Sequence, residues 1–258
     1  MTAPIWLLGC GNMGGALLRR WLAEDMGPVA VIDPAPGALP EGVTALPVPP
    51  AGRPDLIVLA VKPQIWREAA APLAAIAGPF TLIVSVMAGV PLADIAAVFP
   101  ASPLIRAMPN TPAAIGQGVT ALFTTAGDLA EGAAEALFSP AGATVWLSDE
   151  AQFDAVTAVS GSGPAYVYAF IEALAAAGAA AGLDPALAER LARATVTGAA
   201  ALAAAEAATP ARVLRERVTS PNGTTAAGLA VLQPGLTPLV EATVAAAARR
   251  SRELSEGN

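Results

Sequence analysis

The chain has 258 residues, a formal net charge of −7 at pH 7 and a hydrophobic fraction of 55%. The acidic balance argues against nucleic-acid binding, which uses basic surfaces. The single cysteine, Cys10, excludes an intrachain disulfide, and the absence of histidine removes the commonest metal ligand and general acid or base, so we expect no metal site.

The first predicted element is a buried strand that starts at Ile5 and leads directly into a glycine-rich turn. Gly9-Cys10-Gly11-Asn12-Met13-Gly14 and the apolar helical stretch after it form the G-x-G-x-x-G pattern of dinucleotide sites in its strand–turn–helix setting. Gly9 permits the tight turn, Gly11 lets a pyrophosphate approach the backbone, and Gly14 lets helix and strand pack closely. Free N–H groups at the helix start face the phosphate oxygens. The candidate cofactor-binding residues here are Gly9, Gly11, Asn12, Met13 and Gly14. The alternative is a plain glycine-rich turn.

A second short strand, 29–32, ends at Asp33, which lies 24 positions after Gly9. An acidic residue about 20 positions after the glycine turn binds the adenine ribose in such sites. Its charge repels a 2′-phosphate, and no basic residue follows before Arg53. The pattern therefore leans toward NADH over NADPH. The alternative is that Asp33 only opens an Asp-Pro turn.

Strands and helices alternate up to about residue 148, which is typical of a doubly wound Rossmann-type α/β sheet. The carboxyl edge of such a sheet carries the ligand, and Asp33, Lys62 and Asn110 each follow a strand at that edge. Further strands are predicted at 55–61, 80–87, 102–108, 119–124 and 144–147, and helices at 65–77, 91–98 and 128–137. Lys62 is the only lysine among 14 basic residues, which reflects either composition alone or a site that requires a compact ammonium group.

After residue 149 the pattern predicts helices only, rich in the strong helix former alanine. We therefore divide the chain into a dinucleotide-binding domain, 1–149, and an all-helical substrate-binding and dimerisation domain, 150–258. The helices are predicted at 165–181, 185–208, 210–218 and 226–232, with a last one from Pro238. Small-residue helices pack closely on other helices, so we expect a homodimer formed through this domain.

The mean hydropathy of +0.57 raises the question of a membrane segment. The longest uncharged run, 69–93, contains prolines and glycines and reads as helix end, turn, strand and turn, whereas a spanning helix needs about 20 continuous apolar residues. The first strand starts too early for a signal peptide. We expect a cytoplasmic protein without a membrane anchor.

Two segments of the helical half are more polar than helices require, 160–164 and 219–225. Each could be an ordinary cap or turn, because Ser, Thr, Gly and Pro are cap and turn residues. In the second, Gly223 exposes backbone N–H groups, and Thr224 and Thr225 place two hydroxyls at a helix start. Such a place suits a small carboxylate.

The chain resembles pyrroline-5-carboxylate reductases over nearly its whole length. Asn222 departs from the pattern, since the family commonly has glycine there. Asparagine tolerates left-handed backbone angles, so we expect the turn to survive. The matching segments, in the family's order and spacing, are Gly-Cys-Gly-Asn-Met-Gly at 9–14, Ala-Val-Lys-Pro-Gln at 60–64, Arg-Ala-Met-Pro-Asn-Thr-Pro-Ala at 106–113, Ser-Gly-Ser-Gly-Pro-Ala-Tyr at 160–166 and Val-Thr-Ser-Pro-Asn-Gly-Thr-Thr at 218–225.

The resemblance implies hydride transfer from NADPH or NADH to the C=N carbon of L-1-pyrroline-5-carboxylate, which yields L-proline. It implies an interlocked homodimer, often assembled into decamers, and it places the threonine matching Thr225 near the ring nitrogen as the catalytic candidate. The nicotinamide side is bordered by residues matching Ala60, Val61, Lys62, Pro63 and Asn110. The substrate-binding candidates are Ser160, Ser220, Asn222, Gly223, Thr224 and Thr225.

This chemistry is compatible with a chain that lacks histidine. A cyclic imine that arrives protonated accepts hydride without a strong enzymic acid, so the enzyme's task is mostly alignment of two bound partners. Three alternatives stay open. One is a reductase of a related, six-membered cyclic imine. Another is a hydroxy-acid dehydrogenase of the same architecture, whose base could only be Lys62. The third is a non-catalytic dinucleotide sensor.

Overall fold

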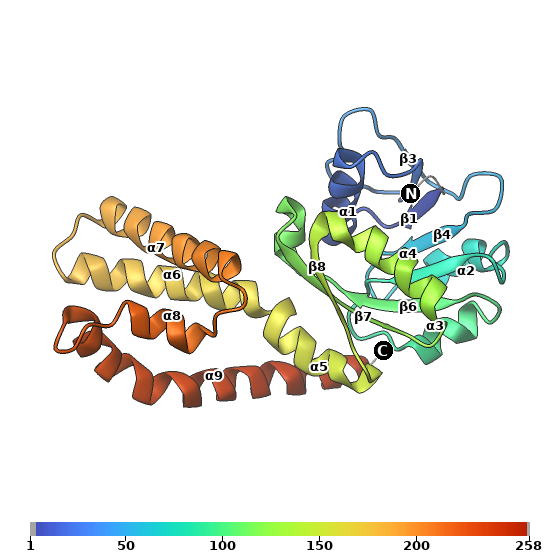
Figure 1. Cartoon of the computed structure of the whole chain (residues 1–258). Helices are drawn as coiled ribbons and strands as arrows, with labels where there is room; N and C mark the ends of the chain where they lie inside the picture. Colours follow the sequence, from blue (N-terminus) through green and yellow to red (C-terminus); the bar gives the residue numbers. More distant parts are fainter. Residues whose placement is uncertain (1–3, 257–258) are drawn as a thin grey trace. The chain divides into compact units, whose positions relative to one another are not determined.

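A computed structural model describes residues 4–256, which divide into two compact units (Figure 1). The first unit runs to Ser162 and takes in the chain again from Ala247 onward. The second runs from Gly163 to Ala246. The helical pattern does start at the predicted place, because Asp149 caps the turn η3 (Glu150–Gln152) with a capping box. Residues 150–162 nevertheless pack with the sheet.

Within the described residues, the first unit is built on an eight-stranded sheet of order β3–β2–β1–β4–β5–β6–β7–β8. Its strands are β1 (Ile5–Leu8), β2 (Val29–Ile32), β3 (Ala45–Leu46), β4 (Leu56–Leu59), β5 (Leu82–Ser85), β6 (Leu104–Met108), β7 (Gly118–Thr124) and β8 (Gly142–Trp146). The predicted strands are all present, several of them shorter than expected. The two-residue strand β3 was not predicted.

β7 is antiparallel to β6, whereas the other neighbouring strands of the described sheet pair in parallel. The connection from β6 to β7 holds only the single 3₁₀ turn η1 (Thr111–Ile115). A parallel crossover needs a dozen or more residues, so the chain reverses here. The ends of β1, β2, β4, β5 and β6 therefore share one edge, as predicted.

Four helices cover the two faces of the sheet. α1 (Asn12–Ala23) and α4 (Asp128–Phe138) pack on one face, and α2 (Trp66–Ala74) and α3 (Leu92–Val98) on the other. Successive side chains of a strand point to opposite faces, and β1 accordingly places Ile5 and Leu7 in the first core and Trp6 and Leu8 in the second.

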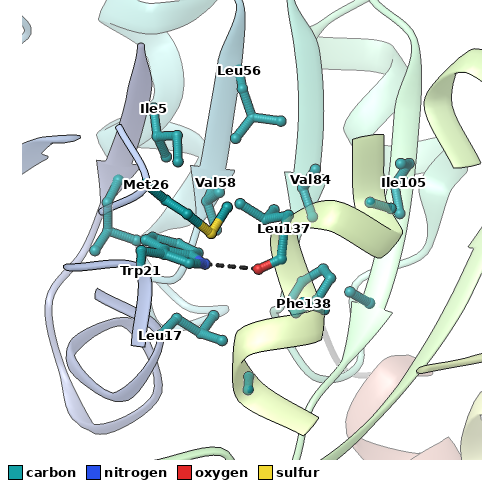
Figure 2. Close-up of a cluster of buried hydrophobic side chains, with 14 of the residues drawn as sticks. Ile5, Leu17, Trp21, Met26, Leu56, Val58, Val84, Ile105, Leu137 and Phe138 are labelled. Atoms are coloured by element: carbon teal, nitrogen blue, oxygen red, sulfur yellow. Dashed lines mark hydrogen bonds between the residues drawn. The ribbon is translucent and has the colours of Figure 1, made fainter. Parts of the chain in front are cut away.

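Figure 2 shows the core between the sheet, α1 and α4. Its largest side chain, Trp21, is fully buried, and the indole N–H donates to the carbonyl of Leu137 (2.8 Å). Burial of this aromatic ring with its polar group satisfied fixes α1 against α4.

The remaining elements are helical. α5 (Phe153–Val156) and the π-helical turn η4 (Thr157–Gly161) belong to the first unit, and α6 (Gly163–Ala180), α7 (Pro185–Ala205) and α8 (Ala211–Arg217) to the second. α9 (Thr224–Glu256) starts in the second unit and ends in the first.

The separate helices predicted at 226–232 and from Pro238 were wrong, because α9 is continuous and contains Pro234 and Pro238. A proline removes one N–H···O=C bond but keeps a helical φ, so neighbouring turns can carry the helix through it. The sequence signal for a helix stop was local and did not account for this continuity.

One helix of the described chain, α9, is long and apolar enough by length and composition to cross a membrane. The segment is Thr224–Ser255, with a mean hydropathy of 1.3 in its most apolar window and none of that window buried. This is weak evidence for a span, because an apolar helix that packs against a partner chain meets the same criteria. The run 69–93 holds the end of α2, β5 and the start of α3, as predicted.

Candidate active site

The glycine turn between β1 and α1 is closely packed against the residues that follow β4. Gly9 has φ +92°, and a Cβ there would lie 2.7 Å from the Ala60 carbonyl oxygen and 2.7 Å from Val61 Cγ1. At Gly14 a Cβ would lie 2.3 Å from the Gly9 carbonyl oxygen. These two glycines therefore have the turn and packing geometry expected of them.

Gly11 differs, because no atom lies within 4 Å of the position a Cβ would occupy. A side chain would fill this open space in front of the first turn of α1. The N–H groups of Asn12, Met13 and Gly14 have no acceptor within the helix, since the first bond of α1 runs from the Gly15 N–H to the Gly11 carbonyl (2.8 Å). Open space beside free N–H groups fits a pyrophosphate.

Asp33 connects the end of β2 to the glycine turn. One carboxylate oxygen accepts the Cys10 N–H (2.7 Å) and the other accepts the Ala35 N–H (2.9 Å). The bond from the Ala35 N–H forms the Asp-Pro turn that the sequence analysis gave as the alternative role of Asp33. Each oxygen keeps a lone pair for a hydroxyl donor, so both roles are compatible.

Cys10 is buried in this turn. Burial, and then the Asp33 charge, raise the pKa of its thiol, while the Arg19 guanidinium on α1 acts in the opposite direction. The thiol is therefore neutral near pH 7, as expected of a small filler. Arg19 is exposed, lies close to Gly15 and, like Asp33, acts on the charge of the Cys10 thiol, so it is a basic group of this turn that a search downstream of Asp33 missed.

The segment after β4 carries the only lysine. The Ala60 N–H donates to the Leu8 carbonyl (2.8 Å), which fixes the start of the segment beside the glycine turn. The Lys62 side chain is exposed, and within residues 4–256 it takes part in no ion pair or side-chain hydrogen bond. Its ammonium group is therefore available to a ligand.

A cavity of about 340 Å³ lies within the first unit at the carboxyl edge of the sheet. It brings together the loops after β4 and β5, both sides of η4 and the last turns of α9. Of its lining residues the sequence analysis named only Pro63 as a site candidate. Gln64 and Ser162 lie within the matching segments 60–64 and 160–166, and the other lining residues lie in no matching segment. The lining residues are Pro63, Gln64, Ala88, Gly89, Thr157, Ser162, Ala247, Arg250, Ser251 and Leu254.

Asn110, after β6, is nearly buried, and its side chain is bonded to protein at both ends. Its Oδ1 accepts the Val119 N–H (2.9 Å), and its Nδ2 donates to the carbonyl of Ser160 (3.1 Å). Ser160 in turn donates its hydroxyl to the Val156 carbonyl (3.0 Å). Two predicted site residues, from different halves of the sequence, are thus in direct contact.

An ion pair that was not predicted lies nearby in the same unit. Arg106 Nη1 lies 2.8 Å from Glu150 Oε1, and the guanidinium lies 4.2 Å from the centre of the Phe153 ring. The same carboxylate oxygen accepts the N–H of Leu92 at the start of α3 (2.7 Å). Arg106 belongs to the motif 106–113, but nothing in the sequence indicated its partner 44 positions away.

The polar turn before α9 lies in the second unit, and it has the expected conformation. Asn222 has φ +61°, so asparagine does adopt the left-handed angle. A Cβ at Gly223 would lie 2.4 Å from Ser220 Oγ and 3.2 Å from the Ser220 carbonyl oxygen, so a larger residue there would require the Ser220 hydroxyl to move. The first N–H groups of α9, at Thr224 and Thr225, have no helical acceptor, and both side chains are exposed.

Two family models match the chain. Residues 4–89 match a family described as NADP oxidoreductase coenzyme F420-dependent, and residues 150–254 match pyrroline-5-carboxylate reductase dimerisation. A pyrroline-5-carboxylate reductase from Pseudomonas aeruginosa is 40% identical, and the alignment covers 99% of this chain and 98% of the relative.

Solved structures of the same enzyme are similar over the full length. One from Coxiella burnetii has a TM-score of 0.88 at 31% identity and covers 98% of this chain and 99% of its own. One from Plasmodium falciparum, with NADP bound, has a TM-score of 0.82 at 25% identity and covers 98% of each chain.

Proposed function

The chain belongs to the pyrroline-5-carboxylate reductase family and is an NAD(P)H-dependent reductase of the C=N bond of L-1-pyrroline-5-carboxylate; we propose which of its residues perform the reaction. The product is L-proline. The observation that carries the assignment of the substrate site is the turn before α9, where a left-handed Asn222 and Gly223 leave the N–H groups and hydroxyls of Thr224 and Thr225 free.

The substrate carboxylate binds this turn. Two backbone N–H groups and two hydroxyls converge there, and the helix dipole of α9 adds about 0.3–2 kcal/mol for an anion. The candidate residues are Ser160, Ser220, Asn222, Gly223, Thr224 and Thr225. Thr225 forms one hydrogen bond at the ring nitrogen and is the catalytic candidate. It is not a proton donor of consequence, because the imine arrives protonated.

The dinucleotide binds the glycine turn, with its pyrophosphate at the free N–H groups of Asn12 and Met13 and in the open space at Gly11. The reduced nicotinamide supplies the hydride. Ala60, Val61, Lys62, Pro63 and Asn110 border the nicotinamide side. The exposed Lys62 ammonium contacts the anionic ligands of this site. A compact ammonium group suits this position, which carries the only lysine in the sequence.

Asp33 favours NADH over NADPH in this proposal, because its charge repels a 2′-phosphate. The positive charge of Arg19 acts against that preference, because it attracts a 2′-phosphate. Asp33→Ser is expected to raise the ratio of NADPH to NADH kcat/KM. Asp33→Asn is the matched control, since it keeps an acceptor for the Cys10 N–H and removes only the charge. An unchanged ratio in both variants contradicts contact between Asp33 and the ribose.

The decisive experiment for the function is oxidation of NADH and of NADPH with the five-membered and the six-membered imine in turn. We expect the five-membered imine to give the higher kcat/KM. A higher value for the six-membered ring assigns the chain to the related imine, and no oxidation with either imine leaves the non-catalytic sensor. Proline or hydroxy-acid oxidation with NAD separates the dehydrogenase alternative.

The dimerisation family model supports self-association, and we take the assembly to be a cytoplasmic homodimer, with decamers as its higher form. Within 163–246 the buried apolar side chains are only Ile171, Ala188 and Ala192. Large apolar side chains of α6, α7 and α9 are exposed, among them Phe170, Leu191, Val231 and Leu239. An exposed apolar surface of this kind indicates a partner chain.

A further inference from the structure

The carbonyl of Ser160 lacks its ordinary helical donor. The chain is helical on both sides of this residue, from α5 through η4 into α6, and Ser162 also has helical angles (φ −85°, ψ −20°). In an α-helix the donor to this carbonyl is the N–H of residue 164, and Pro164 has none. Ser160 is half-buried, and a carbonyl partly withdrawn from water is stabilised when another group supplies the missing donor.

Asn110 supplies that donor from a distant part of the chain. Its Nδ2 donates to the Ser160 carbonyl at 3.1 Å, and its Oδ1 is held by the Val119 N–H of β7. The Asn110 side chain therefore has a fixed orientation. Neither partner group ionises, and the amide is 9% exposed.

This bond holds the π-helical turn η4 against the end of β6. The Ser162 N–H donates to the Thr157 carbonyl (2.8 Å), five residues back, which is the π-type bond of the turn. Gly161 lies so close to the sheet that a Cβ would be 3.1 Å from Met108 Cε. Thr157 and Ser162, on either side of the turn, line the cavity at the carboxyl edge.

We infer that Asn110 is a positioning residue, whose amide replaces the N–H that Pro164 lacks and so fixes η4 as a wall of the cavity at the carboxyl edge, which is also lined by Pro63 of the proposed nicotinamide side. It acts through Ser160 rather than on the reacting atoms. The inference rests on the proposed function for its catalytic consequence, and on the geometry alone for the fixing of η4.

Asn110→Asp tests this inference, because it keeps the shape and the acceptor for Val119 but removes the donor. An ionised carboxylate repels the Ser160 carbonyl, whereas a protonated one can donate to it, and burial favours the protonated form. We expect kcat to fall about 10–100-fold relative to the parent near pH 8, because small displacements of a wall cost rates of that order. The ratio of the variant's kcat to the parent's should recover toward one near pH 6. The Arg106–Glu150 pair is present in both the parent and Asn110→Asp. Any effect of pH on this pair therefore does not change the ratio of the two kcat values.

Two further variants separate positioning from general stability. Thr124→Val removes a hydrogen bond to the Leu104 carbonyl (2.7 Å) at the far end of the same strand pair, and it should lower Tm without changing kcat or its pH profile. Adding Pro164→Ala to Asn110→Asp supplies an N–H at 164 and should restore kcat at high pH. If Asn110→Asp does not fold, Asn110→Ser with and without Pro164→Ala repeats the rescue test.

Hydrogen exchange of 157–162, corrected for intrinsic rates, reports the turn directly and should be faster in Asn110→Asp than in Thr124→Val. A pH-independent loss of kcat shared with Thr124→Val, or absence of rescue by Pro164→Ala, overturns the inference. If the parent itself oxidises neither NADH nor NADPH with the imine, the proposed function fails. In that case the hydrogen-exchange rates of 157–162 alone test whether Asn110 fixes η4.

Discussion

Gly14 and Gly15 are neighbours in α1, but their surroundings differ. A Cβ at Gly14 meets the Gly9 backbone at 2.3 Å, whereas one at Gly15 meets the flexible end of Arg19 at 3.4 Å and Cys10 at 3.8 Å, which are ordinary contact distances. Gly14→Ala should destabilise the protein by about 1–3 kcal/mol through overpacking, and it should weaken NADH binding.

Gly15→Ala is the matched control. It should stabilise the protein by about 0.5–1 kcal/mol, because alanine is the better helix residue. Thermal unfolding and NADH titration of both variants measure the difference. Equal effects of the two substitutions on Tm would show that α1 and the glycine turn are not in the close contact described.

Thr225 is exposed in the first turn of α9. Thr225→Ala should lower kcat about ten- to a thousandfold, as loss of one positioned hydrogen-bonding group does. The Kd for NADH should change little. Thr225→Ser keeps the hydroxyl and should retain most of the activity. A parallel loss of kcat and NADH affinity in Thr225→Ala would assign the hydroxyl to the fold instead.

At the scale of elements, the Arg106–Glu150 pair connects β6, α3 and the start of the helical segment. The two side chains are only 11% and 26% exposed. Removing one partner of a buried pair leaves an uncompensated charge, so Glu150→Ala should cost about 3 kcal/mol. Glu189→Ala, which breaks the exposed pair with Arg193, should cost less than about 1 kcal/mol. Urea unfolding of the two variants gives the comparison, and equal midpoints would contradict it.

The two prolines of α9 show how far an element can be read from local signals. Pro238 is an ordinary helix-start residue in sequence, and the sequence analysis interpreted it so. The helix nevertheless continues through both positions, because each proline removes one N–H···O=C bond but keeps a helical φ. Local composition located the helix but not its length.

At the scale of the whole molecule, α9 presents its apolar residues to solvent within one chain. Leu239→Glu, at a position 65% exposed, should yield a smaller mass by light scattering at micromolar concentration, because it places a charge in the expected interface. Leu129→Glu, at a more accessible position on α4 (93%), should leave the assembly intact. A monomeric parent protein would end the proposal of self-association.

The sequence by itself determined the features that depend on neighbouring residues. The strand–turn–helix around Gly9, the alternation up to 148, the helical half and the left-handed turn at Asn222 all follow from local propensity, periodicity and backbone conformation. Only the tertiary structure revealed the continuity of α9 and the contacts of Arg106 with Glu150 and of Asn110 with Ser160. The two contacts join residues that are close in space but 44 and 50 positions apart in the chain, and no local pattern encodes such contacts.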